Sequence, residues 1–115
     1  MSEVELDIVV ENHKRCSVVT VSGRVDSSNA NNLDNTLKEL LDTETANIIL
    51  ELSGVEYMSS AGLRAIVSAL RDAKKKRGDV KVVTPSDRVA EVFSLAGLLP
   101  LFETFDDLTA AVGSF

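Results

Sequence analysis

Two adjacent serines, Ser59 and Ser60, stand where an apolar run, NIILELSGV, gives way to a helical pattern. Either hydroxyl could be the N-cap of that helix, an interaction that contributes about 1 kcal/mol. A cap uses one hydroxyl and leaves the other without a role. Arg64 follows near the start of the helix, where the helix dipole disfavours a cation. A helix N-terminus with free amides and a nearby arginine is well arranged to receive an anion such as a phosphate.

Arg64 lies four residues after Ser60 and therefore on the same face of the predicted helix. Arg71 and Lys75 extend that face toward the helix C-terminus. On the residues alone, a solvated helix face is the simpler interpretation, and an anion or phosphate site is the alternative. The sequence pattern leaves both interpretations open.

Other residues that could do chemistry are few. The one histidine, His13, stands in a polar stretch with no visible catalytic partner, and MSSAG lacks the G-x-S-x-G form of a nucleophile elbow. The one cysteine, Cys16, begins an apolar run and is expected to be a buried thiol. The sequence has no Cys/His set for zinc and no glycine-rich phosphate loop. We therefore expect no catalytic residue, no metal site and no cofactor.

The charge balance argues against polyanionic partners. The net charge is −6 and the pI is about 4.7, so nucleic acid and anionic membrane surfaces are repelled. The basic run KKKR at 74–77 is expected to be the solvated C-terminal end of a helix. The start, MSEVELD, does not resemble a signal peptide, and no apolar run is long enough to cross a bilayer. We expect a cytoplasmic protein with no direct membrane insertion.

Apolar periodicity predicts an alternating order of strands and helices. Gly23 is expected to break the second strand, Ser27 or Ser28 to cap the first helix, and Gly78 to end the second helix as its C′ residue. Asp34 is expected to pair with Lys38 one turn later. The strands are predicted over 4–10, 16–22 with a short continuation at 24–26, 47–52, 79–83 and, as an extended piece, 99–105. The helices are predicted over 30–41, 60–77 and 106–112, and a turn followed by a capped helix is predicted over 84–98.

This order predicts an α/β fold with a mixed sheet of four to five strands packed with about four helices. The strand at 47–52 carries apolar residues on both faces and is expected to be central. The sheet is expected to be mostly parallel in its second half, because strands and helices alternate there. The length of 115 residues predicts one domain, 1–115.

From about residue 16 to 100 the chain resembles a STAS domain, the fold shared by anti-sigma factor antagonists and the cytoplasmic tails of sulfate transporters. Three stretches carry the resemblance, in the same order along the chain: VSGRVD, IILELSGVEYMSSAGLRAIVSALRDAKKKRGDVKVV and TPSDRVAEVFSLAGL. The second stretch is particularly similar to the bacterial antagonists.

The family's central motif is typically Asp-Ser-Ser/Thr/Ala-Gly-Leu, in which the serine after the aspartate is phosphorylated. The resemblance sets Ser60 at the phosphorylated position, with Ala61, Gly62 and Leu63 completing the motif. Ser59 stands in place of the family's aspartate, and Arg64 stands where the family often has glycine. The match at GRVD implies that Asp26 lies beside the phosphorylated serine.

The resemblance implies a non-enzymatic, phosphorylatable binding module. Unphosphorylated, such a protein binds an anti-sigma factor serine kinase and frees a sigma factor; a serine phosphatase reverses the phosphorylation. The expected partner-binding residues are Asp26, Ser59, Ala61, Gly62, Leu63 and Arg64. The alternative is a structural STAS subunit, either of a stressosome-like scaffold or of a lipid-transporting ABC permease complex, which would use the same surface for assembly.

Overall fold

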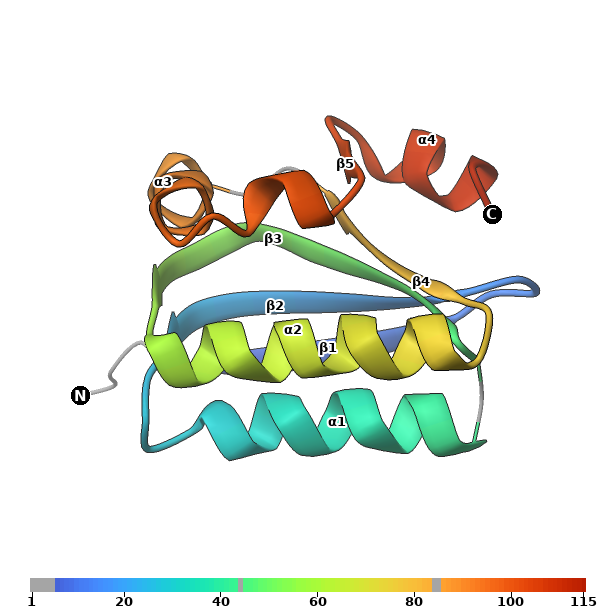
Figure 1. Ribbon diagram of the computed structural model, residues 1–115, viewed down its shortest axis with the longest axis horizontal. Coiled ribbons are helices and arrows are strands. Elements are labelled where there is room, and N and C mark those ends of the chain that lie inside the picture. Colours follow the sequence, from blue (N-terminus) through green and yellow to red (C-terminus); the bar gives the residue numbers. More distant parts are fainter. Residues whose placement is uncertain (1–5, 44, 84–85) are drawn as a thin grey trace.

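A five-stranded sheet forms the centre of the computed structural model, which describes residues 6–43, 45–83 and 86–115 (Figure 1). The strands lie in the order β1-β2-β3-β4-β5, so spatial order follows chain order. β1 (Asp7–Asn12) is antiparallel to β2 (Ser17–Val25). β3 (Asn47–Met58), β4 (Asp79–Val83) and β5 (Thr104–Phe105) continue the sheet in parallel pairings. The expected mixed sheet, parallel in its second half, is confirmed.

Figure 1 shows the two longest helices, α1 (Ala30–Thr43) and α2 (Ser60–Lys75), side by side along one face of the sheet. The chain then forms α3 (Asp87–Leu95), a short 3-10 helix η1 (Leu99–Leu101) and α4 (Leu108–Gly113), which lies on the other side of the sheet. Asp34 pairs with Lys38 on α1 at 3.0 Å, as the four-residue spacing predicts. The predicted α/β fold class is confirmed.

β3 is the central strand and separates two apolar cores. Ile48, Leu50 and Leu52 face the larger core beneath α1 and α2, whereas Ile49 faces a smaller core covered by α4. All four side chains are fully buried. A strand with apolar residues on both faces must be covered on both sides, and the prediction of a central strand is confirmed.

β1 is less buried than its alternating pattern predicts. The expected strand began at residue 4, which lies outside the described residues, and one face was expected to be buried. Leu6 and Ile8, on the face expected to be buried, are half-buried, but Val10 on the same face exposes 39% of its surface. β1 pairs with β2 at the edge of the sheet, so the core covers only the start of the strand.

β2 runs through Gly23, which was expected to break it. Gly23 has a φ of 96°, a value that glycine adopts without steric cost. The register against β3 shifts between Gly23 and Arg24, as in a β-bulge, and the strand continues to Val25. Gly23 therefore bends the strand instead of ending it.

The first helix begins at Ala30, as predicted, but neither Ser27 nor Ser28 caps it directly. The carbonyl of Asp26 accepts the amides of Asn29 and Ala30, which closes a turn before α1. Ser28 donates both its amide and its hydroxyl to Asp26 Oδ1, at 2.9 and 2.6 Å. The serine-rich stretch thus belongs to a turn that is organised by the side chain of Asp26.

The start of α2 resolves which of the two serines is the cap. Ser59 has an extended backbone, and its Oγ accepts the amide of Gly62 at 3.2 Å. Ser60 is the first residue of the helix. Ser59 is therefore the N-cap, and the hydroxyl of Ser60 is left for another role.

The end of α2 differs from the prediction by one residue. Arg77, not Gly78, occupies the left-handed C′ position, with a φ of 67°. The amide of Gly78 donates to the carbonyl of Ala73 at 2.8 Å and that of Arg77 to the carbonyl of Lys74 at 3.1 Å. These paired bonds form a Schellman motif.

Gly78 is required for space, because a Cβ atom at this position would overlap the backbone carbonyl of Ala46. The tight approach brings the end of α2 against the segment that leads into β3. The amide of Asp79 donates to the same carbonyl at 3.0 Å.

The C-terminal elements follow the prediction with one exception. Ser86 caps α3, and Val89 and Phe93 are buried against the larger core. The turn expected at 84–85 lies outside the described residues. The piece expected to be extended begins instead as the helix η1, with Pro100 in its first turn, and only Thr104 and Phe105 pair with β4.

Ser59→Ala is expected to lower the free energy of unfolding by about 1 kcal/mol, because Gly62 loses its N-cap acceptor. The matched change Ser60→Ala is expected to stay within about 0.5 kcal/mol, since its hydroxyl caps nothing. Urea denaturation of the two variants checks this. A larger loss for Ser60→Ala would contradict the assignment of the cap.

Gly78→Ala is expected to lower the free energy of unfolding by about 2 kcal/mol, because the backbone must move away from Ala46. Gly113→Ala is the control, since no atom lies within 4 Å of a Cβ atom there. Thermal denaturation of both variants measures the difference, and equal melting temperatures would rule out the steric explanation.

Candidate functional site

The ends of β2 and β3 meet at the start of α2 and place the predicted site residues together. Val25 pairs with Met58 at the end of the ladder, and the amide of Ser59 donates to the carbonyl of Val25 at 2.8 Å. Asp26 follows Val25 directly, so the turn that it organises lies next to the two serines. The parallel pairing of β2 and β3 explains why residues more than thirty positions apart share one edge of the sheet.

Asp26 is half-buried and holds the turn before α1. The hydrogen bonds from the hydroxyl and the amide of Ser28 lower the pKa of Asp26 below its ordinary value. The carboxylate is therefore ionised at neutral pH. It adds a fixed negative charge beside the site and keeps one of its oxygens engaged with Ser28.

Ser60 is exposed at the N-terminus of α2. Among the described residues, neither its hydroxyl nor the amides of Ser60 and Ala61 have a hydrogen-bond partner. No acidic residue stands in the first turn of the helix. The position thus offers an accessible nucleophilic oxygen beside two free amides, where the helix dipole favours negative charge.

The next residues of the motif face inward. Gly62 is buried, and a Cβ atom there would overlap the side chains of Met58 and Val25. Leu63 is 9% exposed and Ala61 is half-buried. Gly62 lets the first turn of α2 lie directly on the strand ends, and this close contact directs Ser60 outward.

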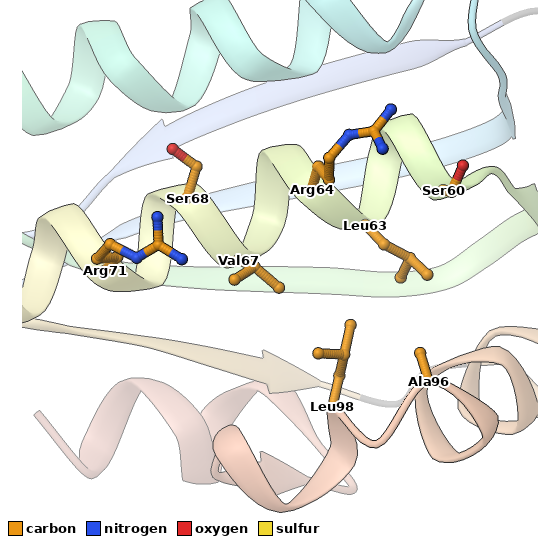
Figure 2. A pocket seen from close by; sticks show the side chains of 8 residues that line it. All are labelled: Ser60, Leu63, Arg64, Val67, Ser68, Arg71, Ala96 and Leu98. Atoms are coloured by element: carbon orange, nitrogen blue, oxygen red, sulfur yellow. The ribbon is translucent and has the colours of Figure 1, made fainter.

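Arg64 is exposed and has no ion-pair partner among the described residues. Figure 2 shows its side chain on the same side of α2 as Ser60, directed back toward the helix N-terminus. Arg64 borders two hollows, one on the side of α3 and one between α1 and α2. Arg71 also borders the first hollow, whereas Lys75 borders a different one beside Lys76. Of the three cations predicted to lie on one face of the helix, only Arg64 and Arg71 border the same hollow.

The hollow on the side of α3, here called the α2 groove, has a volume of about 490 Å³. Leu63 and Val67 are directed from α2 toward Leu98 across it (Figure 2). The groove is lined by Ser60, Leu63, Arg64, Val67, Ser68 and Arg71 from α2, and by Ala96 and Leu98 from the segment after α3. Ala96 and Leu98 were not predicted as site residues, because only the fold brings the segment after α3 to this face.

The other candidates for chemistry lie away from this site. His13 is exposed and its ring lies 3.2 Å from Glu11 Oε1. Cys16 is buried, as predicted, and burial raises the pKa of its thiol. Among residues 6–43, 45–83 and 86–115, no cluster of His, Cys, Asp or Glu could hold a metal ion. No helix in the same ranges combines the length and apolarity that crossing a membrane requires.

Comparison with known proteins finds relatives over nearly the whole chain. BtrV of Bordetella bronchiseptica, which is named as an anti-sigma factor antagonist, is 29% identical over 98 residues, covering 85% of this chain and 84% of BtrV. The crystal structure of an anti-sigma factor antagonist from Mycobacterium paratuberculosis matches with a TM-score of 0.85 at 26% identity, covering 96% of this chain and 93% of that one.

The fold is also shared with a protein solved in two states. The anti-sigma factor antagonist SpoIIAA matches in its unphosphorylated form with a TM-score of 0.83 at 18% identity, covering 92% of this chain and 93% of SpoIIAA. The phosphorylated form, from Bacillus, matches with a TM-score of 0.78 at 17% identity, covering 94% and 98%. The model of the STAS domain family matches residues 7–111. Since this match spans most of its length, the chain belongs to the STAS domain family.

Proposed function

We propose that the protein is an anti-sigma factor antagonist controlled by phosphorylation of Ser60. Unphosphorylated, it binds an anti-sigma factor serine kinase in the cytoplasm and so releases a sigma factor; a serine phosphatase restores the binding form. It acts by binding and catalyses no reaction. The observation that carries the proposal is the exposed Ser60 hydroxyl, without a hydrogen-bond partner among the described residues, at a helix N-terminus beside the α2 groove.

The surroundings of Ser60 favour a phosphate on the free protein. A phosphoserine carries a charge of about −1.5 to −2 at neutral pH. The amides of Ser60 and Ala61 and the guanidinium of Arg64 are the groups that could stabilise it. Phosphorylation is therefore expected to leave the fold intact.

The same phosphate is unfavourable in a complex. A partner that covers Ser60 and the adjoining groove must remove water from a dianion, at an effective cost of several kcal/mol. Each 1.4 kcal/mol changes affinity about tenfold, so a micromolar complex would be lost. In the proposed switch, the free protein accommodates the phosphate on Ser60, and the same phosphate prevents the partner from binding.

Ser59 in place of the family's aspartate departs from the motif but is compatible with this arrangement. Ser59 Oγ already accepts the amide of Gly62, so the cap needs no carboxylate. A carboxylate at that position would repel a phosphate on the neighbouring residue, and the neutral hydroxyl removes this repulsion. Asp26 nearby keeps its negative charge, partly offset by its bonds from Ser28.

SpoIIAA provides independent support from its two solved forms. Both the unphosphorylated and the phosphorylated structure match this fold, with TM-scores of 0.83 and 0.78. A STAS fold can therefore carry a phosphate without large rearrangement, as the switch requires.

Incubation with ATP and a purified anti-sigma factor serine kinase from the source genome is expected to add one phosphate to the protein, on Ser60. Mass spectrometry of proteolytic peptides locates the modification. Ser60→Ala is expected to abolish it, whereas Ser68→Ala, which removes a second hydroxyl bordering the same groove, is expected to leave it unchanged.

Phosphate found elsewhere, with Ser60 unmodified, would overturn the acceptor assignment. A chain that binds its kinase tightly but is never phosphorylated would instead be a constitutive binder.

Ser60→Asp is expected to weaken kinase binding at least tenfold, because the interface must desolvate a new charge. Its melting temperature is expected to fall little or to rise, since an acidic residue at a helix N-terminus is favoured by a few tenths of a kcal/mol. Ser60→Asn, of similar size and neutral, is the control for calorimetric titration. Equal affinities for the two variants would argue against the charge-based switch.

A further inference from the structure

The α2 groove is a basic, apolar hollow on an acidic protein. The chain has a net charge of −6, yet no Asp or Glu of the described ranges borders this groove, whereas Arg64 and Arg71 do. Leu63, Val67 and Leu98 supply its apolar surface, and Leu95, next in sequence to Ala96, is 82% exposed. Such a contrast with the rest of the surface favours an acidic ligand.

The two arginines are available to a ligand. Both side chains are exposed, and neither guanidinium forms an ion pair or hydrogen bond within the described part of the chain. Two nearby cations are engaged differently: Lys74 lies 3.3 Å from Asp79, and Lys76, directly after α2, donates to the carbonyl of Leu41 at 2.6 Å. An exposed guanidinium without a partner keeps all of its donors for a carboxylate.

We propose that the α2 groove binds an acidic amphipathic helix of the anti-sigma factor. This inference rests on the proposed function and identifies the chemistry of the partner segment. The apolar side chains of the helix lie against Leu63, Val67 and Leu98, and its carboxylates pair with Arg64 and Arg71.

The spacing of the arginines sets the pattern of the partner helix. Arg64 and Arg71 are seven residues apart, which is two helical turns or roughly 10 Å along α2. A helix that lies alongside α2 matches this distance with two carboxylates seven residues apart. Apolar residues at the third and fourth positions between them lie on the same face and reach the apolar surface of the groove.

The position of Ser60 in the groove also explains how a phosphate on Ser60 weakens binding of the partner. Ser60 borders the groove, and the side chain of Arg64 is directed back toward the helix N-terminus (Figure 2). A phosphate on Ser60 competes with the partner's carboxylate for Arg64 and repels that carboxylate. Phosphorylation thereby removes one attraction and adds one repulsion at a single point of the interface.

Two synthetic helical peptides test the chemistry without the natural partner. Both carry the same apolar residues at the third and fourth positions, and they differ only at two positions seven residues apart, which are Glu in one peptide and Lys in the other. Titration into the full-length ¹⁵N-labelled protein is expected to shift amide signals of residues 63–71 and 96–98 with the Glu peptide only. Equal shifts from both peptides, or shifts elsewhere, would overturn the proposal.

Charge reversal provides matched controls. Arg71→Glu is expected to weaken binding of the Glu peptide and of the purified anti-sigma factor at least tenfold. Lys75→Glu makes the same change in net charge one turn further along α2, outside the groove, and is expected to retain wild-type affinity. A similar loss for both variants would indicate a general charge effect and contradict the groove assignment.

The kinase assay separates this proposal from the proposed function. If the anti-sigma factor binds and phosphorylates Ser60 equally in the wild-type and Arg71→Glu chains, the switch stands and the groove proposal is wrong. If no anti-sigma factor binds the wild-type chain, the proposed function and the assignment of the helix to that partner both fail. Self-association that Arg71→Glu abolishes, measured by analytical ultracentrifugation, would assign the groove to a second copy of the chain and overturn the proposal.

Discussion

The contact between the first turn of α2 and the ends of β2 and β3 is the constraint on which the candidate site depends. The carbonyl of Val25 accepts the amide of Ser59, and Gly62 leaves no room for a Cβ atom over Val25 and Met58. These two features fix both the position and the rotation of the helix start. Ser60 must then point away from the sheet, because its neighbours at positions 62 and 63 occupy the inward face. An exposed serine hydroxyl in a fixed place is thus a consequence of core packing.

Much of this arrangement could be predicted from the sequence, because it depends on local periodicity. The two-faced apolar pattern at 48–52 identifies the central strand, and the break at the two serines identifies the start of α2. The predictions failed where tertiary contacts override local preference. Arg77 takes the left-handed position because Gly78 is needed against Ala46, and Val10 stays exposed because β1 lies at the edge. Neither the close approach of Gly78 to Ala46 nor the place of β1 at the sheet edge can be recognised in the local sequence pattern.

The site itself was predictable only in part, for the same reason. The serines, Arg64 and Asp26 stand in short motifs that can be recognised in the sequence, and the parallel β2–β3 pairing brings them to one edge. Leu98 and Ala96 come from the segment after α3, more than thirty residues from Ser60. They lie in the third stretch that resembles the family, but nothing in that stretch places them beside Ser60. The charge contrast of the groove is likewise a property of the folded surface, since the composition alone indicates only an acidic protein.

The energetics of a switch at this position require a partner. Moving a binding equilibrium from almost complete to almost absent takes about 5.5 kcal/mol of differential affinity. Exposed charges at a helix N-terminus differ by only about 0.3 to 1 kcal/mol in their effect on the folded chain, so a phosphate there cannot supply this energy by altering the fold. Desolvation of a dianion under a partner can supply it, because burying a charge costs several kcal/mol. The packing of Gly62 against the strand ends holds Ser60 in a fixed position, so the desolvation cost of its phosphate lowers the stability of the complex. A mobile segment would instead carry the phosphate away from the partner. The buried Gly62 and the exposed Ser60 therefore act together. Gly62 fixes the backbone, and because Ser60 then stays within the interface, its phosphorylation causes a loss of binding.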